Sequence, residues 1–342
     1  MIIDPSGRAL DYLRLSLTDR CNLRCVYCMP EGGVGWKPHA EILRFEEFLR
    51  LCRVLCALGI RRIKLTGGEP LVRRGLEDFV RELREIPLLE EITLTTNGLL
   101  LAEFLDRLGD DARFLLNGVN VSLNTPDAAN FARIARRDGL GAALEGMRRA
   151  AAAGLPVKLN CVPVRSFNEQ DLAATAVLAK NEVKAVRFIE LMPLGAGASL
   201  EGVPMAEVRG ILEREFGGLR RDHSRIGNGP AVYYAAPGFA GKIGFISAIS
   251  ETFCAGCNRL RLSADGRLRA CLASELSVDL RALLRSGAGD DEIKSAVLRL
   301  AASKPAAHNF AGPAKSGGRG ESGELPEQEY CRIPEGMYRI GG

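Results

Sequence analysis

The feature that most constrains the fold is an alternation of β-rich runs and amphipathic helical stretches between about residues 12 and 191. Six runs are typical of buried strands, namely YLRLSL, RRIKLT, EITLTT, GVNVSL, PVKLNCVPV and AVRFIEL. Helical stretches such as FEEFLRLCRVLCALG and LEDFVRELREI follow most of them. The pattern predicts βα units around a parallel sheet. Six units fit either a partial eight-unit barrel or an open doubly wound sheet.

Both architectures place functional side chains at the carboxyl ends of the strands. The unusual loops of this chain fall at those ends. They are Cys21 to Cys28 after the first run, Gly67-Gly68-Glu69-Pro70 after the second, Thr95-Thr96-Asn97-Gly98 after the third, and Ser122 at the end of the fourth. We therefore expect one shared site at this edge of the sheet.

The regular alternation fades after Gly195, and residues 229–250 are typical of hairpin strands. We predict a first domain over residues 1–228 and a smaller C-terminal domain over residues 229–342. The stretch from Ser303 to Gln328 is rich in Gly, Pro, Ser and Ala, which predicts an irregular loop.

Charge and hydropathy exclude some partners. The 46 Lys and Arg residues nearly balance 42 Asp and Glu residues, and no long basic run is present, so we expect no nucleic-acid partner. No segment approaches the roughly 20 apolar residues of a membrane span. We therefore expect a cytoplasmic protein without a membrane partner. Ten cysteines in a reducing compartment indicate metal ligation or redox chemistry, and six of them form two tight groups.

The first group is Cys21, Cys25 and Cys28, three thiolates within eight residues. A compact loop with this spacing can bind three corners of a four-iron cube and leave one iron open to a ligand. The alternative is a zinc site, although structural zinc prefers four ligands in paired Cys-x-x-Cys hooks.

The second group is Cys254, Cys257 and, after thirteen intervening residues, Cys271. It also offers three thiolates and an open iron. A zinc site completed by His308 and a thioredoxin-like pair at Cys254 and Cys257 are the alternatives. Arg259 and Arg261 beside this group suit an anionic, phosphorylated substrate. For the other cysteines, Cys52, Cys56, Cys161 and Cys331, we expect small buried hydrophobic side chains.

The motifs resemble known enzymes. Cys-x-x-x-Cys-x-x-Cys with Tyr27 before the last cysteine is similar to the signature of radical S-adenosylmethionine enzymes, and Gly67-Gly68-Glu69-Pro70 matches their glycine-rich motif. Glu69 is expected to act there as a polar anchor rather than as a base. The double cysteine arrangement, with the segments LTGGEPLVR and FCAGCNRLRLSADGRLRACL and a terminal Gly341-Gly342, resembles the GTP 3′,8-cyclase family of molybdenum cofactor biosynthesis.

The resemblance implies an α/β fold, a partial (βα)6 TIM-type barrel with a smaller C-terminal domain that closes its open side. It implies a radical lyase that uses two 4Fe-4S clusters and S-adenosylmethionine to convert GTP to (8S)-3′,8-cyclo-7,8-dihydroguanosine 5′-triphosphate. Family knowledge also suggests an electron donor such as flavodoxin or ferredoxin, a homodimer, and a Gly341-Gly342 tail that reaches the active site. A peptide-modifying radical enzyme with an auxiliary cluster is the nearest rival.

Carried over by motif, the resemblance assigns residues to each site. The catalytic residues are Cys21, Cys25, Cys28, Arg259 and Arg261, and the cluster ligands are Cys21, Cys25, Cys28, Cys254, Cys257 and Cys271. S-adenosylmethionine is lined by Tyr27, Gly68, Ser122 and Met192, and GTP by Arg14, Lys64, Thr95, Lys158, Arg259, Leu260 and Arg261. Two positions depart from the family pattern: Lys64 replaces an arginine and Asn124 an aspartate.

Overall fold

A computed structural model of the chain describes residues 1–224, 226–308 and 310. These residues form one sheet of twelve strands in the order β12-β11-β10-β1-β2-β3-β4-β5-β6-β9-β8-β7. The strands are β1 (Tyr12–Ser16), β2 (Arg62–Thr66), β3 (Glu91–Thr96), β4 (Gly118–Ser122), β5 (Val157–Cys161), β6 (Ala185–Ile189), β7 (Arg220–Asp222), β8 (Val232–Ala235), β9 (Lys242–Ile246), β10 (Arg259–Leu262), β11 (Arg267–Arg269) and β12 (Ser277–Asp279).

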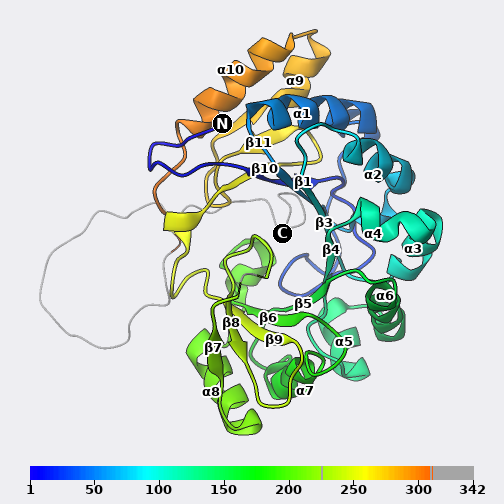
Figure 1. Ribbon diagram of the computed structural model, residues 1–342, viewed down its shortest axis with the longest axis vertical. Helices are drawn as coiled ribbons and strands as arrows, with labels where there is room; N and C mark the ends of the chain where they lie inside the picture. Colours follow the sequence, from blue (N-terminus) through cyan, green and yellow to red (C-terminus); the bar gives the residue numbers. More distant parts are fainter. Residues whose placement is uncertain (225, 309, 311–342) are drawn as a thin grey trace, which may run out of the picture.

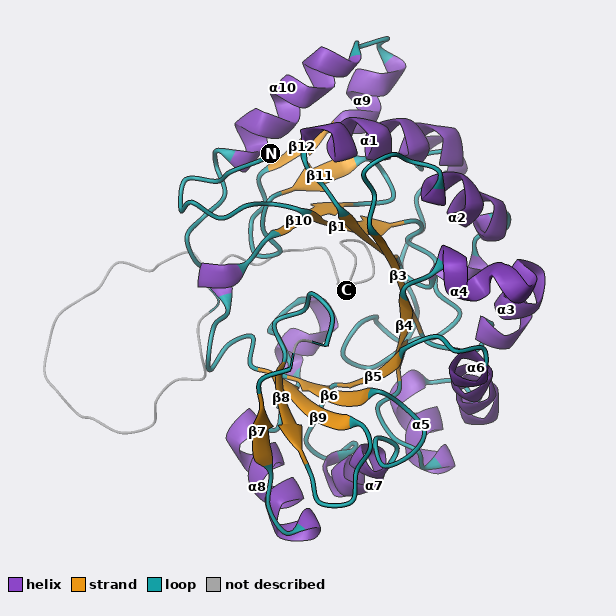
Figure 2. Ribbon diagram, viewed as in Figure 1, coloured by secondary structure: helices purple, strands orange, loops and turns teal. Residues whose placement is uncertain are grey.

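The sheet curves, and helices cover its outer side (Figures 1 and 2). The helices are α1 (Phe45–Leu58), α2 (Leu76–Arg84), α3 (Leu101–Leu108), α4 (Ala112–Leu115), α5 (Ala128–Ala135), α6 (Leu140–Ala152), α7 (Leu172–Val177), α8 (Met205–Phe216), α9 (Leu280–Arg285) and α10 (Asp290–Ala301). This arrangement confirms the predicted α/β partial barrel and excludes the open doubly wound sheet, in which helices would cover both faces.

The six predicted strands are β1 to β6, and they pair in parallel in chain order. Their outward residues are aliphatic and lie in the main hydrophobic core with the helices, as Leu13 and Leu15 of β1 do. On α1, apolar residues at helical spacing such as Phe48, Leu51 and Leu55 are fully buried, so the helix packs one face on the sheet. The apolar faces of the strands and of the helices therefore pack together in one hydrophobic core.

The C-terminal part extends this sheet at both edges. Strand β9 pairs in parallel with β6, and β10 pairs in parallel with β1. Two parallel strands are thus added to the six. Beyond β9 the sheet continues with the antiparallel strands β8 and β7, and beyond β10 with the antiparallel strands β11 and β12. Strands β8 and β9 are the hairpin predicted for residues 229–250.

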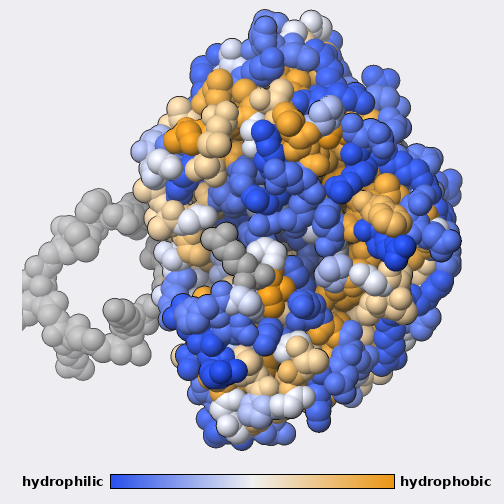
Figure 3. Space-filling view, viewed as in Figure 1, coloured by the Kyte–Doolittle hydropathy of each residue, from blue (hydrophilic) through white to orange (hydrophobic). Residues whose placement is uncertain are grey.

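The predicted domain boundary between residues 228 and 229 falls in the loop between β7 and β8. These two strands pair with each other across that boundary, and the division into two domains stays a prediction. Cys52, Cys56 and Cys161 are buried apolar residues as predicted. Cys331, the Gly341-Gly342 tail and most of the Ser303 to Gln328 stretch lie outside the described residues. Within the described part of the chain, every helix is too short or too polar to cross a bilayer. Hydrophilic side chains cover much of the face over the barrel mouth (Figure 3).

Candidate active site inside the barrel

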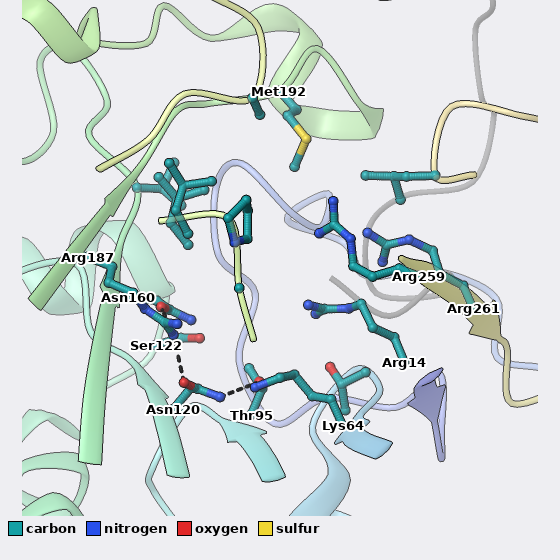
Figure 4. A pocket seen from close by; sticks show the side chains of 18 of the residues that line it. Arg14, Lys64, Thr95, Asn120, Ser122, Asn160, Arg187, Met192, Arg259 and Arg261 are labelled. Atoms are coloured by element: carbon teal, nitrogen blue, oxygen red, sulfur yellow. Dashed lines mark hydrogen bonds between the residues drawn. The ribbon is translucent and has the colours of Figure 1, made fainter. Parts of the chain in front are cut away.

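Polar and charged side chains line the inner face of the curved sheet. Because side chains alternate along a strand, the residues between the buried aliphatic ones point into the barrel. In β2, for example, Ile63 and Leu65 are fully buried in the core and Lys64 lines the interior. The interior is a cavity of about 330 Å³. Its strand residues include Lys158 and, labelled in Figure 4, Arg14, Lys64, Thr95, Asn120, Ser122, Asn160, Arg187, Arg259 and Arg261.

The first cysteine triplet lies in the loop after β1 and faces this cavity. Leu23, Val26 and Met29, which alternate with the cysteines, are buried and hold the loop down. The loop is also tied to the end of α5, because the Arg24 and Val26 amides donate to the carbonyls of Ala135 and Ile134, both at 2.9 Å. A short apolar-anchored loop therefore presents three thiols to one space.

The glycine-rich loop after β2 packs on the same loop. The Gly68 amide donates to the Thr18 carbonyl at 2.7 Å, and a Cβ on Gly68 would lie 2.3 Å from the Arg20 carbonyl oxygen. Only glycine fits such a close backbone approach. This contact explains the glycine of the motif and brings the ends of β1 and β2 together.

Glu69 is an anchor, as the sequence predicted. Its buried carboxylate accepts hydrogen bonds from the Leu71 amide at 3.0 Å, the Thr96 hydroxyl at 2.7 Å and the Asn97 amide at 2.7 Å. Burial raises the pKa of Glu69 to about 7, while these three donors work in the opposite direction. The Glu69 carboxylate therefore fixes the loops after β2 and β3 to each other, and its hydrogen bonds have a structural role.

Tyr27 is held by Asn124, one of the two residues that depart from the family pattern. Asn124 Nδ2 donates to the Tyr27 hydroxyl at 2.9 Å, and Asn124 Oδ1 accepts from the Val162 amide at 2.9 Å. Both ends of the side-chain amide are therefore satisfied. The substitution keeps Tyr27 against the cavity, together with Ser122 and Met192.

The second cysteine triplet faces the same cavity from the turn before β10 and the segment after β11, at the edge of the sheet where β10 pairs with β1. Cys254 and Cys257 come from the turn before β10, where the Cys257 amide donates to the Cys254 carbonyl at 3.0 Å, and Cys271 follows β11. Although burial raises it, the positive charges of Arg259 and Lys304 lower the pKa of Cys257 to about 6. This site therefore favours thiolate and other anions.

Positive charge is concentrated on the inner face. Arg261 of β10 and Arg14 of β1 are register neighbours, and Arg14 is in turn paired with Lys64 of β2. Burial, followed by repulsion from neighbouring cations, lowers the pKa of Arg14 to about 10 and that of Lys158 to about 8. Buried like charges are costly unless an anion joins them. The inner face is thus built for a ligand with several negative charges.

One end of the cavity is closed by the loop that follows β7. Lys158 Nζ donates to the Ile226 carbonyl at 3.2 Å, and the Asn228 side-chain amide donates to the Glu91 carboxylate. Gly227 has a φ of +76°, and a Cβ there would lie 2.4 Å from Lys158 Nζ. This glycine therefore allows the loop to pack closely against Lys158 at this end of the barrel.

The donor sets fit iron-sulfur clusters better than single metal ions. Within residues 1–224, 226–308 and 310, no three His, Cys, Asp or Glu side chains converge closely enough to hold one ion. A zinc ion needs its thiolates about 2.3 Å from a single point, whereas cluster thiolates each bond a different iron. His308 Nε2 donates to the Ala248 carbonyl at 2.8 Å and its Nδ1 accepts from the Phe310 amide at 3.3 Å, so both ring nitrogens are engaged within the protein.

Comparison with known proteins gives the family. Residues 15–179 match the family model described as Radical SAM superfamily, and residues 184–310 match Molybdenum Cofactor Synthesis C. A GTP 3′,8-cyclase from Pelotomaculum thermopropionicum is 48% identical over 311 residues, which cover 90% of this chain and 95% of that protein. Another, from Moorella thermoacetica, is 45% identical and covers 99% of both chains. The chain belongs to the GTP 3′,8-cyclase family.

The fold of this cyclase family member also occurs in solved structures. The crystal structure of Streptococcus suis SuiB bound to S-adenosylmethionine superposes with a TM-score of 0.58 at 14% identity, covering 84% of this chain and 68% of SuiB. At this identity the likeness concerns the fold alone. The resemblance stated from the sequence is therefore confirmed for family and fold.

The structure brings the predicted site residues of the cyclase together, with one difference. The cavity is lined by all six cluster cysteines and by the four residues predicted for S-adenosylmethionine. It is also lined by six of the seven residues predicted for GTP, namely Arg14, Lys64, Thr95, Lys158, Arg259 and Arg261. Leu260 is fully buried in the hydrophobic core on the outer face of β10. The Leu260 side chain therefore cannot contact a nucleotide in the barrel, and only its backbone is available.

Sequence reasoning missed Arg187 on β6. Its guanidinium donates from Nη2 to Asn120 Oδ1 at 2.7 Å and to Asn160 Oδ1 at 2.6 Å, while its buried Nε has no hydrogen-bond partner among the described residues. Figure 4 shows Arg187 across the cavity from Arg14 and Arg259. The signal was present, because Arg187 alternates with the apolar Val186 and Phe188 in the run AVRFIEL.

Proposed function

We propose that the chain is a GTP 3′,8-cyclase that forms (8S)-3′,8-cyclo-7,8-dihydroguanosine 5′-triphosphate from GTP in molybdenum cofactor biosynthesis. One observation carries this proposal: two separate cysteine triplets and a set of inward-facing cations line the same cavity. The fit of each triplet to a 4Fe-4S cluster with one open iron supports two different roles.

The first triplet is assigned to radical generation. Cys21, Cys25 and Cys28 would hold the first cluster, which together with S-adenosylmethionine would supply radical chemistry at the ribose. Tyr27, Gly68, Ser122 and Met192 line the cosubstrate. The role of the chain is to fix this cosubstrate by packing and to exclude water, because a bound geometry close to the reacting arrangement removes much of the entropic barrier.

The second triplet and the cations are assigned to GTP. Cys254, Cys257 and Cys271 would hold the second cluster, and Arg259 and Arg261 would orient the nucleotide. Arg14, Lys64, Thr95, Lys158 and Arg187 bind the triphosphate, with forked guanidinium donors at Arg14 and Arg187. Lys64 contributes a point charge where a guanidinium would make two hydrogen bonds. The nucleotide is thereby held with C3′ toward the first triplet.

The proposed partners and location rest on the resemblance to the family. The first cluster needs a low-potential electron donor, for which a flavodoxin or ferredoxin is suited, and the chain acts in the cytoplasm as a homodimer without nucleic acid or membrane. Sedimentation of the anaerobic protein tests the dimer, and reduction by a purified flavodoxin or ferredoxin tests the donor. A monomer, or a protein that neither donor reduces, contradicts the corresponding part.

The activity is tested with reduced, anaerobic protein that is supplied with S-adenosylmethionine and GTP. We expect 5′-deoxyadenosine and a cyclised nucleotide in equal amounts. Arg261→Met is expected to lose the cyclised product, and Arg149→Met, which removes an exposed cation paired with Asp106 outside the barrel, is expected to keep it. Turnover with another nucleotide or a peptide, but not with GTP, would falsify the proposal.

A further inference from the structure

Lys304 is a buried cation outside every motif that the sequence identified. It follows α10, its side chain lies inside the protein with only 4% of the residue exposed, and its ammonium group points at the second cysteine triplet. Burial of an ammonium group is costly unless hydrogen bonds and an opposite charge compensate it. The question is therefore which groups around Lys304 play that role.

Its hydrogen bonds go to the two chain segments that carry Cys257 and Cys271. Lys304 Nζ donates to the carbonyl of Arg259, two residues after Cys257, at 2.9 Å, and to the carbonyl of Ala270, next to Cys271. The third direction of the ammonium group meets Cys257 Sγ at 3.7 Å. One side chain thus connects the start of β10 with the end of β11 and contacts a cluster ligand directly.

The sulfur atoms of the second triplet are the electrostatic neighbours that favour the charged form of Lys304. The electrostatic neighbours that favour its charged form are Cys257 and Cys271, and those that oppose it are Arg8 and Arg259. Within the described residues, no carboxylate is within ion-pair distance of Lys304. The ligands of the second cluster are therefore the counter-charge that makes this buried ammonium tolerable.

A second cation fixes the segment that carries Lys304. Arg8, held by an ion pair with Asp4 at 2.5 Å, donates to the carbonyls of Pro305 at 2.6 Å and Ala306 at 2.9 Å, and also to that of Cys254 at 2.7 Å. All three cysteine-bearing segments are therefore hydrogen-bonded to Arg8 or Lys304. The position of the ammonium group relative to the triplet is set by this arrangement rather than by a free side chain.

We propose that Lys304 is a positioning residue for the second cluster, whose ammonium group fixes the spacing of Cys257 and Cys271 and makes the reduction potential of that cluster more positive. A positive charge and an N–H donor against a ligand sulfur stabilise the more negative, reduced state of an iron-sulfur cluster. Lys304 touches neither substrate nor reacting atoms, so it acts through Cys257. The inference rests on the assignment of a cluster to the second triplet, but not on GTP as the substrate.

The test uses the full chain with Cys21, Cys25 and Cys28 all changed to Ala, so that only the second cluster is present. The midpoint potential of that cluster is followed by EPR during an anaerobic redox titration, without GTP or S-adenosylmethionine. Lys304→Met is expected to shift the potential in the negative direction. Lys304→Gln, which keeps N–H donors for the two carbonyls but has no charge, is expected to shift it in the same direction, and Lys304→Arg is expected to restore most of it.

Lys294→Met is the matched control, because Lys294 lies on α10 and pairs with the exposed Asp291, away from the triplet. It is expected to leave the potential unchanged. Iron content and melting temperature are measured for every variant, so a misfolded Lys304→Met leaves Lys304→Gln as the deciding comparison. An unchanged potential in Lys304→Gln, with full iron content, overturns the proposal, as does a second triplet that binds no iron. A potential shift supports this inference whether or not the parent chain, which carries both triplets, cyclises GTP; failure of that parent chain to cyclise GTP contradicts the proposed function alone.

Discussion

The two cysteine triplets offer the same ligands but lie among opposite charges. At the first triplet, burial is the main cause that raises the pKa of Cys21 to about 11, and the nearby Glu69 raises it further while Arg24 lowers it. At the second triplet, the pKa of Cys257 falls to about 6 beside Arg259 and Lys304, although burial acts against this. The first site therefore disfavours additional negative charge, and the second attracts it.

This difference matches the charges of the two ligands. S-adenosylmethionine carries a sulfonium and an ammonium group against one carboxylate, so its net charge is positive, whereas GTP carries several negative charges. Electrostatic complementarity then directs each ligand to its own cluster, because a buried charge next to a like charge is strongly disfavoured. One cavity can thus hold two open irons without exchanging their ligands.

The largest expected effect comes from removing one ligand of each triplet. Cys25→Ala is expected to halve the iron content from about eight per chain and to abolish formation of 5′-deoxyadenosine. Cys257→Ala is expected to halve the iron content as well, but to keep some cleavage of S-adenosylmethionine while the cyclised nucleotide disappears. Iron analysis and product chromatography measure both.

Cys52→Ala is the control for these variants, because Cys52 is buried in α1 among apolar residues. It is expected to retain the full iron content. Equal loss of S-adenosylmethionine cleavage in Cys25→Ala and Cys257→Ala would contradict the separate roles.

A smaller effect is expected from Arg187→Met, which removes one of the cations opposite Arg14. Loss of a charge-assisted hydrogen bond to a phosphate typically costs about 1.5 to 3 kcal/mol, so the affinity for GTP should fall about 10- to 100-fold. Binding of guanosine, which has no phosphate, should hardly change. Calorimetric titration of the anaerobic protein with each ligand measures the difference, and an equal loss for both ligands speaks against a phosphate contact.

A pH dependence of GTP binding is expected from Lys158. Its neighbours on the inner face are Arg187, which lowers its pKa, and Glu91, which raises it, and burial is the main cause of the value of about 8. As the pH rises through 8, the free protein loses this charge, whereas bound triphosphate would keep the ammonium group protonated. The affinity for GTP should therefore fall about tenfold between pH 7 and pH 9.

Lys158→Met isolates this contribution. The variant should bind GTP more weakly than the parent protein at pH 7. Its affinity for GTP should not show the tenfold fall between pH 7 and pH 9 that is assigned to Lys158. A pH profile that is the same in the variant and the parent protein shows that another group titrates.

The smallest effect is expected from Asn124→Asp, which restores the residue usual in the family. An aspartate can accept from both the Val162 amide and the Tyr27 hydroxyl, because the phenol can reverse its role from acceptor to donor. The affinity for S-adenosylmethionine should change by less than about threefold. A larger change, measured by equilibrium dialysis, would show that the direction of the Tyr27 hydrogen bond matters to the first site.

Much of the barrel could be predicted from local patterns. Each of β1 to β6 carries its own alternation of aliphatic and polar residues, and the cysteine spacings lie within short segments. The pairing of β10 with β1 could not be predicted, because it joins Tyr12 to Arg259 across most of the chain. The same holds for β9 beside β6, so the sequence showed six units where the sheet has eight parallel strands.

The site residues show the same limit. Arg187 and Leu260 could both have been placed by strand alternation, since one lies between apolar residues and the other between arginines that face the barrel. Lys304 could not, because it follows a helix in a stretch without a motif and reaches the triplet only through tertiary packing. Local periodicity predicts which way a strand residue points, but not which distant segments meet.

The most direct test of the opposite charges is which ligand perturbs which cluster. One variant keeps only Cys21, Cys25 and Cys28, another keeps only Cys254, Cys257 and Cys271, and the EPR spectrum of each reduced protein is recorded with each ligand. S-adenosylmethionine should change only the spectrum of the first variant, and GTP only that of the second. If GTP changes the spectrum of the first cluster, or S-adenosylmethionine that of the second, the assignment of the two triplets is wrong.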